Sequence, residues 1–195
     1  MNMRRWTDHT TEVFLAVVGE ITDDQFGDPT ELPGWTRAHI VAHVHCNAEA
    51  LLRLLHWART GEKTPMYAGP VQRAAEIEEG AALPPQELRR RVKESADRLA
   101  AAVDSMPQSA WDAEVVTAQG RTVPAHELLW MRTREVAVHA IDLHAGVRFA
   151  DLPDEVNTAL VIDAARKHSM TGGAAALAAW LTGRTGEAPA LQPWL

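Results

Sequence analysis

The sequence predicts a mainly α-helical protein, a four-helix bundle with a short, mostly helical C-terminal extension. Three observations lead to this prediction. Apolar residues recur at the three- to four-residue spacing of helices along most of the 195-residue chain. Glycine and proline mostly fall between these periodic segments. Four segments are also long enough to bury a shared apolar stripe, as the helices of a bundle do.

A loop rich in proline and glycine separates the first two predicted helices. The first helix is expected over residues 4–24 and the loop over residues 27–35. Thr36 has the short hydroxyl side chain that often caps a helix N-terminus, so the second helix is expected to start there and to end near Thr60. The expected buried side of the first helix consists of Val13, Phe14, Val17, Val18 and Ile21.

The middle of the chain predicts a short helix, a third long helix and an irregular segment. The short helix is expected over residues 71–80. Two prolines open the third long helix, residues 84–106, because proline is favoured in the first turn of a helix. Residues 107–122 are expected to be irregular, with an extended piece at Val115 and Val116.

The fourth long helix is predicted to begin at Pro124 and to run to Ala145. Gly146 follows and is the expected stop, because glycine readily adopts the left-handed backbone that ends many helices. This helix completes the set of four that a bundle requires.

The last part of the chain predicts a small helical extension. A helix is expected over residues 153–168, then a break at the glycine pair 172–173, an alanine-rich helix ending near Gly183 and an extended tail. A segment this small would not be stable alone, so we expect it to pack on the bundle. The predicted domains are therefore the bundle, residues 1–147, and an extension, residues 148–195.

Composition and charge exclude several classes of protein. The chain carries 26 acidic and 19 basic residues, a net charge of -7, and no basic helical stripe, which argues against nucleic acid as a partner. A single cysteine, Cys46, excludes an internal disulfide. The N-terminus turns polar where a signal peptide would be apolar, and no apolar run approaches membrane-spanning length. We expect a cytoplasmic monomer that does not bind membranes.

The fourth predicted helix carries polar residues on its apolar face. Glu135 and His139 are four residues apart, so their side chains lie on one side of the helix, one turn apart. Arg132 and Asp142 fall on the same arc, whose expected apolar members are Leu128, Met131, Val138 and Leu143. Burying such groups without partners costs roughly several kcal/mol. This face is therefore expected to bind a ligand or an ion.

The second predicted helix contributes His43 and Asn47 to its inward stripe. Two imidazoles and one carboxylate from two helices make a three-ligand zinc site with one open position, which is the catalytic form of such sites. The candidate ligands are thus His43, Glu135 and His139. Asp142 would then orient a ligand imidazole or pair with Arg132, and Arg132 would alternatively face a substrate carboxylate.

Simpler interpretations exist for each of these residues. One histidine on an apolar face is more often a hydrogen-bonded core residue than a ligand. A Glu–His pair four residues apart is also common on helix surfaces. The site therefore depends on the combination of both helices.

Several segments resemble those of a known family. Residues 32–43 (LPGWTRAHIVAH), followed by 47–51 (NAEAL), and residues 130–143 (WMRTREVAVHAIDL) resemble the two signatures of mycothiol-dependent maleylpyruvate isomerases. The closing residues 180–184 (WLTGR) and 193–195 (PWL) extend the likeness over most of the chain. The metal-binding domain of that family belongs to the DinB-like four-helix bundles.

The resemblance implies that His43, Glu135 and His139 bind zinc, and that Arg184 engages substrate carboxylates. It also implies mycothiol, or another small thiol, as cosubstrate, and a small carboxylated electrophile as substrate. Zinc with an open position lowers the pKa of a bound thiol, so thiolate is available at neutral pH. We expect this thiolate to add to the double bond of maleylpyruvate and to leave after rotation, giving fumarylpyruvate. Arg132 and Arg184 are the expected catalytic residues, and Asn47 and Asp142 the expected cofactor-binding ones.

Two other functions fit the same ligands. A thiol S-transferase would use the same thiolate but keep it attached to the electrophile. A non-catalytic, regulatory metal-binding bundle would hold the ion and turn nothing over. A hydrolase is less favoured, because the H-E-x-x-H arrangement is absent. Cys46 is interpreted as a small core residue, so the attacking sulfur is expected to come from the cosubstrate.

Overall fold

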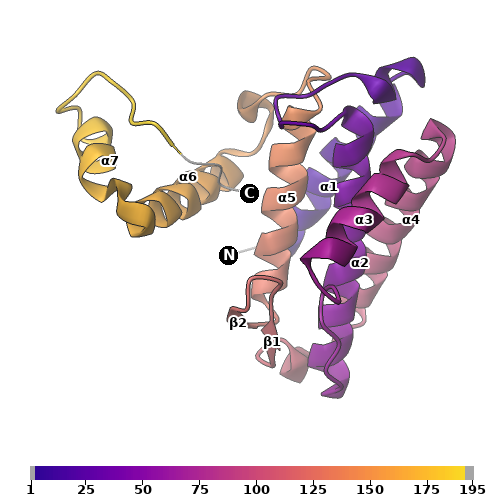
Figure 1. The fold of residues 1–195 in the computed structure, drawn as a ribbon. Coiled ribbons are helices and arrows are strands. Elements are labelled where there is room, and N and C mark those ends of the chain that lie inside the picture. Colours follow the sequence, from indigo (N-terminus) through magenta and orange to yellow (C-terminus); the bar gives the residue numbers. More distant parts are fainter. Residues whose placement is uncertain (1–2, 192–195) are drawn as a thin grey trace. The chain divides into compact units, whose positions relative to one another are not determined.

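A computed structural model describes residues 3–191 of the chain (Figure 1). The chain divides into two compact units, Met1–Val147 and Arg148–Leu195. Residues 193–195, which contribute to the family resemblance, and the end of the predicted tail lie outside the described residues. The predicted packing of the extension on the bundle stays a prediction.

The first unit is a four-helix bundle, as predicted. Its long helices are α1 (Met3–Glu20), α2 (Arg37–Thr60), α4 (Pro85–Asp104) and α5 (Glu127–Asp142). Helix α2 packs against α4 and α5, and α1 packs against α5 and α4 (Figure 1). A shorter helix, α3 (Pro70–Ala81), lies along the outside of α2. Short 3₁₀ turns are formed by Asp24–Gly27 and Gln108–Ala110.

Two clusters of buried apolar side chains fill the bundle. The first draws on all four long helices and includes Phe14, Ile40, Val92 and Val136. The second includes Leu51, Leu54, Leu99 and Leu128, together with Val115 and Val123. Each fully buried aliphatic side chain contributes about 1.5–3 kcal/mol, so these clusters hold the helices that carry the polar site.

Helix α2 starts where the sequence predicts, with Thr36 at its N-cap. His39 takes the place that Glu or Gln usually has in a capping box. Its Nδ1 lies 3.1 Å from the backbone nitrogen of Thr36 and 2.8 Å from the Thr36 hydroxyl oxygen. Gly61, with φ of 77°, ends the helix. His39 is thereby engaged at the helix end, whereas His43 remains one turn further along.

The segment before α5 corrects one predicted boundary. Strands β1 (Glu114–Val116) and β2 (Thr122–Pro124) form an antiparallel hairpin in which Val115 pairs with Val123, and both valines are buried. Pro124 therefore ends a strand, and α5 begins at Glu127 rather than at the proline. Two short apolar segments separated by a turn favour a hairpin. Residues up to Pro124 therefore form a strand, and the helix begins only after the hairpin.

The end of α5 also comes earlier than predicted. The helix stops at Asp142, and His144 adopts a left-handed backbone with φ of 47° before Gly146 does so with φ of 97°. A residue other than glycine seldom adopts the left-handed backbone conformation. The sequence therefore predicted that the helix ends at Gly146 and not near His144.

The second unit contains α6 (Asp154–His168) and α7 (Ala174–Leu181), preceded by a 3₁₀ turn at Phe149–Asp151. The Ser169–Gly173 segment joins the two helices, and Gly172, with φ of 98°, breaks the helical path. The predicted break at the glycine pair is confirmed.

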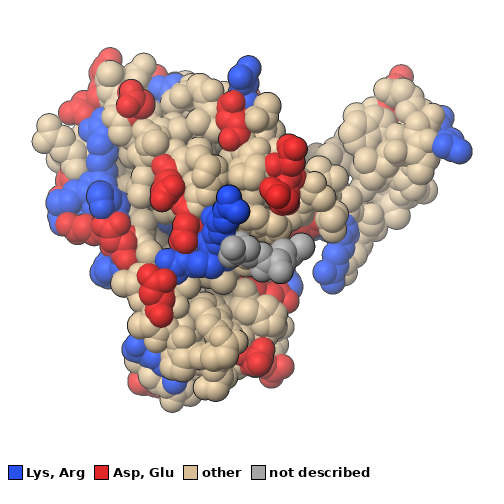
Figure 2. Space-filling view, turned by 180° about the vertical axis from the view of Figure 1, so that it is seen from behind, with Lys and Arg blue, Asp and Glu red and all other residues tan. Residues whose placement is uncertain are grey.

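Charged side chains of both signs mingle over the bundle face that Figure 2 shows, with no large patch of one sign. Within residues 3–191, no helix is both long and apolar enough to cross a membrane.

Candidate metal centre

Three side chains from two helices of the bundle meet at one point. His43 comes from α2, and Glu135 and His139 come from α5. One ligand atom from each lies within 4.8 Å of the others. The Glu135 Oε2 atom is 2.9 Å from His43 Nε2 and 3.5 Å from His139 Nε2. Both histidines are only 4% exposed. The structure therefore brings together the three ligands that the sequence suggests.

Asp142 fixes the orientation of one of these imidazoles. Its Oδ2 atom lies 2.8 Å from His139 Nδ1, at a spacing of three residues on α5. With Nδ1–H donating to this carboxylate, the other ring nitrogen, Nε2, is directed toward Glu135, where a cation could replace its proton. The arrangement prepares His139 to bind a cation through Nε2.

Burial is the largest effect on the pKa of each residue in the cluster. It lowers the pKa of His43. At His139, hydrogen bonds with Asp142 and Glu135 outweigh burial and raise the pKa to about 9. At Glu135, burial opposes ionisation, but hydrogen bonds from His139 and His43 outweigh it and hold the pKa of the carboxyl below its usual range. Without a metal ion, the ionised Glu135 is therefore paired with a protonated His139, whose proton a bound cation would replace.

Arg132 and Asn47 are joined to each other beside this cluster. Arg132 is 2% exposed, and its Nη1 donates to the Val44 carbonyl oxygen at 2.8 Å and to Asn47 Oδ1 at 2.9 Å. Burial lowers the pKa of Arg132 to about 10. These contacts tie α5 to α2, which favours a structural role for both residues over the catalytic and cofactor-binding roles expected from the sequence.

Sequence reasoning missed the residues that surround His43. The ring of Trp35 lies 5.4 Å from that of His43. Arg73, on α3, places Nη2 3.3 Å from His43 Nδ1 and lies over the ring of Tyr67. Arg73 lies on α3, which a loop separates from α2. Helical periodicity relates residues of one helix only, so it could not predict that Arg73 contacts His43.

Arg184 belongs to the second unit, just after α7. It is exposed and donates to the Thr182 carbonyl oxygen. Its predicted contact with substrate carboxylates stays a prediction.

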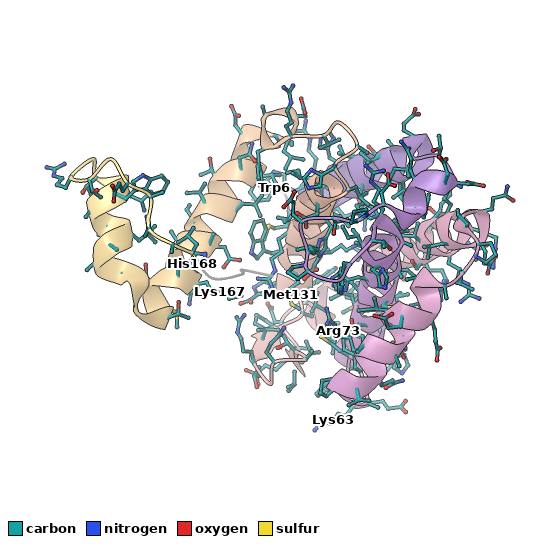
Figure 3. The ribbon with its side chains drawn as sticks, turned by 45° about the horizontal axis from the view of Figure 1, so that its top comes forward. Trp6, Lys63, Arg73, Met131, Lys167 and His168 are labelled. Carbon is teal, nitrogen blue, oxygen red and sulfur yellow. The ribbon has the colours of Figure 1, made fainter. Side chains whose placement is uncertain are left out.

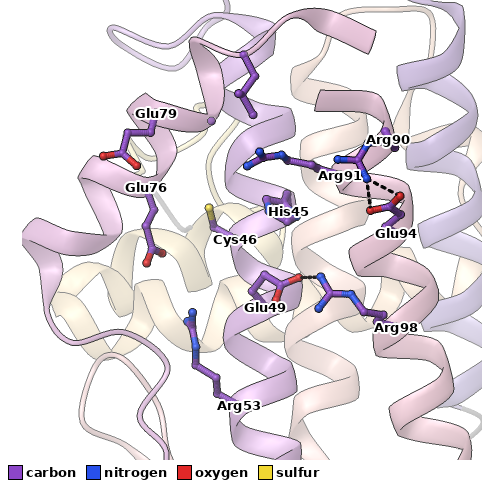
Figure 4. Close-up of a pocket in the computed structure, with 12 residues that line it drawn as sticks. His45, Cys46, Glu49, Arg53, Glu76, Glu79, Arg90, Arg91, Glu94 and Arg98 are labelled. Carbon is purple, nitrogen blue, oxygen red and sulfur yellow. Dashed lines mark hydrogen bonds and ion pairs between the residues drawn. The ribbon is translucent and has the colours of Figure 1, made fainter. Parts of the chain in front are cut away.

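A cavity of about 660 Å³ lies between α2, α3 and α4 and includes none of the three candidate ligands (Figure 4). Two of its arginines pair with glutamates of the same lining, Arg98 with Glu49 and Arg90 with Glu94. Cys46 borders it but is 6% exposed, and burial raises the pKa of its thiol to about 11. Cys46 is therefore a poor nucleophile, in agreement with the prediction that the reactive sulfur comes from a cosubstrate.

The donor set suits a zinc ion. Imidazole nitrogens and a carboxylate oxygen are ordinary zinc ligands, and three protein ligands leave a position for another molecule. The fold and the site together define a four-helix bundle with a candidate catalytic metal centre.

Comparison with known proteins gives the family. Residues 7–144 match the family model of the mycothiol maleylpyruvate isomerase N-terminal domain, and the chain belongs to this family. It is also similar to a crystal structure of the mycothiol-dependent maleylpyruvate isomerase, with 41% identity and a TM-score of 0.85 over 88% of this chain and 73% of that one. A histidine-to-alanine mutant of that isomerase matches at 40% identity, with the same TM-score and coverage. No curated protein matches. The resemblance and the DinB-like bundle expected from the sequence are confirmed.

Proposed function

We propose that this protein is a zinc- and mycothiol-dependent isomerase that converts maleylpyruvate to fumarylpyruvate. Family membership and 41% identity to such an isomerase support the reaction. The observation that carries the proposal is the meeting of His43, Glu135 and His139 in one buried cluster. A cytoplasmic location and a monomeric state are part of the same proposal.

The three clustered residues would hold the zinc ion. When bound there, zinc lowers the pKa of a thiol at its open position, so that thiolate is available at neutral pH. Asp142 engages His139 Nδ1, so that Nε2 would be the nitrogen that binds the ion once its proton is lost. The burial of both histidines keeps water from competing for these donor atoms.

The reaction needs no oxidant and consumes no thiol. The thiolate of mycothiol adds to one carbon of the cis double bond, which becomes a single bond, while the electron pair moves toward the adjacent carbonyl. Rotation about the single bond follows. The carbon–sulfur bond then breaks, the double bond re-forms as trans, and the thiolate is released.

The test is an isomerase assay with the zinc-loaded protein, following the loss of maleylpyruvate absorbance. We expect turnover only when both mycothiol and zinc are present. A stable thioether detected by mass spectrometry would identify an S-transferase instead, and full zinc occupancy without turnover would identify a non-catalytic metal-binding bundle.

A further inference from the structure

Arg73 is the arginine whose side chain reaches His43 from outside the two ligand-bearing helices. It projects from α3 toward the bundle (Figure 3). Its guanidinium lies 5.9 Å from the centre of the Tyr67 ring, and its Nη2 is 3.3 Å from His43 Nδ1. The side chain is neither fully buried nor fully exposed. It therefore stands at the border between the cluster and solvent.

The contact between Arg73 and His43 is incompatible with metal binding through His43 Nε2. A neutral imidazole carries one N–H, so a ring that binds an ion through Nε2 keeps its proton on Nδ1. A guanidinium only donates hydrogen bonds, and two donors would then face each other. Arg73 therefore loses its contact with His43 when the centre is loaded, and its Nη2 donor becomes available.

The charged groups around the cluster indicate that Arg73 could bind an anionic substrate. Glu135 and Asp142 are acidic, and the buried Arg132 is already hydrogen-bonded to Val44 and Asn47. An anionic substrate approaching the open position needs a cation with free donors. A guanidinium matches a carboxylate with two parallel hydrogen bonds.

We propose that Arg73 binds a carboxylate of the unsaturated dicarboxylate substrate beside the metal centre. This inference rests on the proposed function. Arg73 would then be a residue of the bundle that selects substrates with a carboxylate group. Tyr67, packed under the guanidinium, would hold the side chain in place once it leaves His43.

The test measures binding of succinate, a saturated dicarboxylate that cannot isomerise, to zinc-loaded protein by calorimetry. Arg73→Gln should weaken succinate binding by about 10-fold or more, since it removes a charge-assisted contact. Arg73→Lys should restore part of the affinity. The control, Arg98→Gln, removes an exposed arginine from the cavity of Figure 4 and should change nothing. All three variants should retain their zinc.

Three results would overturn the proposal: no succinate binding by the unaltered protein, equal binding by Arg73→Gln, or loss of zinc from Arg73→Gln, which would make Arg73 a support for His43. In the isomerase assay, Arg73→Gln should raise KM for maleylpyruvate more than it lowers kcat. If the unaltered protein lacked isomerase activity, the proposed function would fail, while succinate binding would still decide the role of Arg73.

Discussion

His139 and Asp142 illustrate how one side chain prepares another for binding. The 2.8 Å contact uses the imidazole nitrogen that faces away from Glu135, so the other nitrogen is oriented before any ion arrives. Outer carboxylates of this kind fix both the tautomer and the ring position of a ligand histidine. Asp142 therefore acts through His139.

Removing this carboxylate should weaken zinc binding without abolishing it. We expect Asp142→Ala to reduce zinc affinity by about 10- to 100-fold, measured by competition with a chelating dye. Asp97→Ala, which removes an exposed aspartate of α4 paired with Lys93, is the matched control and should leave the affinity unchanged. Equal zinc affinity in Asp142→Ala and the unaltered protein would show that His139 needs no such orientation.

Cys46 should react slowly with alkylating agents, because burial disfavours the thiolate and moves the pKa of the thiol up from 9.0 to about 11. The alkylation rate with iodoacetamide should therefore rise about tenfold per pH unit through about pH 10. A rate that levels off near pH 9 would mean an ordinary, accessible thiol.

Cys46→Ser should keep most of the isomerase activity, because the attacking sulfur is expected to come from the cosubstrate. An inactive Cys46→Ser protein would contradict an external nucleophile.

At the scale of helices, Arg132 links α5 to α2 through the Val44 carbonyl and Asn47. Because His43 lies on one of these helices and Glu135 on the other, the link maintains the spacing of the candidate metal ligands. The sequence placed Arg132 on the correct face of the helix. Periodicity does not show, however, whether an inward arginine forms hydrogen bonds between helices or contacts a substrate.

Loss of this link should destabilise the bundle. Arg132→Ala leaves two buried acceptors without their donor and creates a cavity, so it should cost about 3 kcal/mol in the free energy of unfolding by urea. Arg121→Ala removes an exposed arginine and should change the stability by about 1 kcal/mol at most. A similar small effect in Arg132→Ala would argue against a structural role.

The packing of α3 on α2 depends on a close approach at Gly80. A Cβ atom added there would lie 2.8 Å from the Cβ of Ala42. Gly80→Ala should therefore destabilise the protein by about 1–3 kcal/mol despite the better helix propensity of alanine. Gly19→Ala, at the equivalent next-to-last position of α1 with open space around it, should be stabilising by up to about 1 kcal/mol. Stabilisation in both variants would show that α3 does not pack closely on α2.

The sequence predicted most of the fold because helical periodicity and the breaking residues coincide. Val17 and Val18 are buried and α2 begins after Thr36, as expected. The buried face of α5 was partly misplaced: Val136 and Ala137 are fully buried, whereas the predicted Val138 is not. An error of one position rotates a helix by 100°, and the polar residues of the site obscure its apolar stripe.

The candidate ligands were accessible from sequence because two of them share one helix at a fixed spacing. Bringing His43 to them required the bundle architecture, which the four periodic segments predicted and the family resemblance supported. Arg73 was not accessible, since its position depends on how a short helix and the loop before it pack against α2.

At the scale of the whole molecule, the bundle contains both the candidate metal centre and the candidate carboxylate-binding arginine within one compact unit. The second unit carries Arg184, the residue that the family resemblance links to the substrate. Arg184→Ala should mainly raise KM for maleylpyruvate, and an unchanged KM would remove Arg184 from the site.

The central claim is that His43, Glu135 and His139 bind one zinc ion per chain. Elemental analysis of the purified protein and of two variants, His43→Ala and His56→Ala, tests it most directly. His56 lies on the same helix, and its side chain is 41% exposed, compared with 6% for His43. We predict one zinc per chain in the unaltered protein and in His56→Ala, and clearly less in His43→Ala. Equal zinc content in all three proteins, or none in any, would contradict the account.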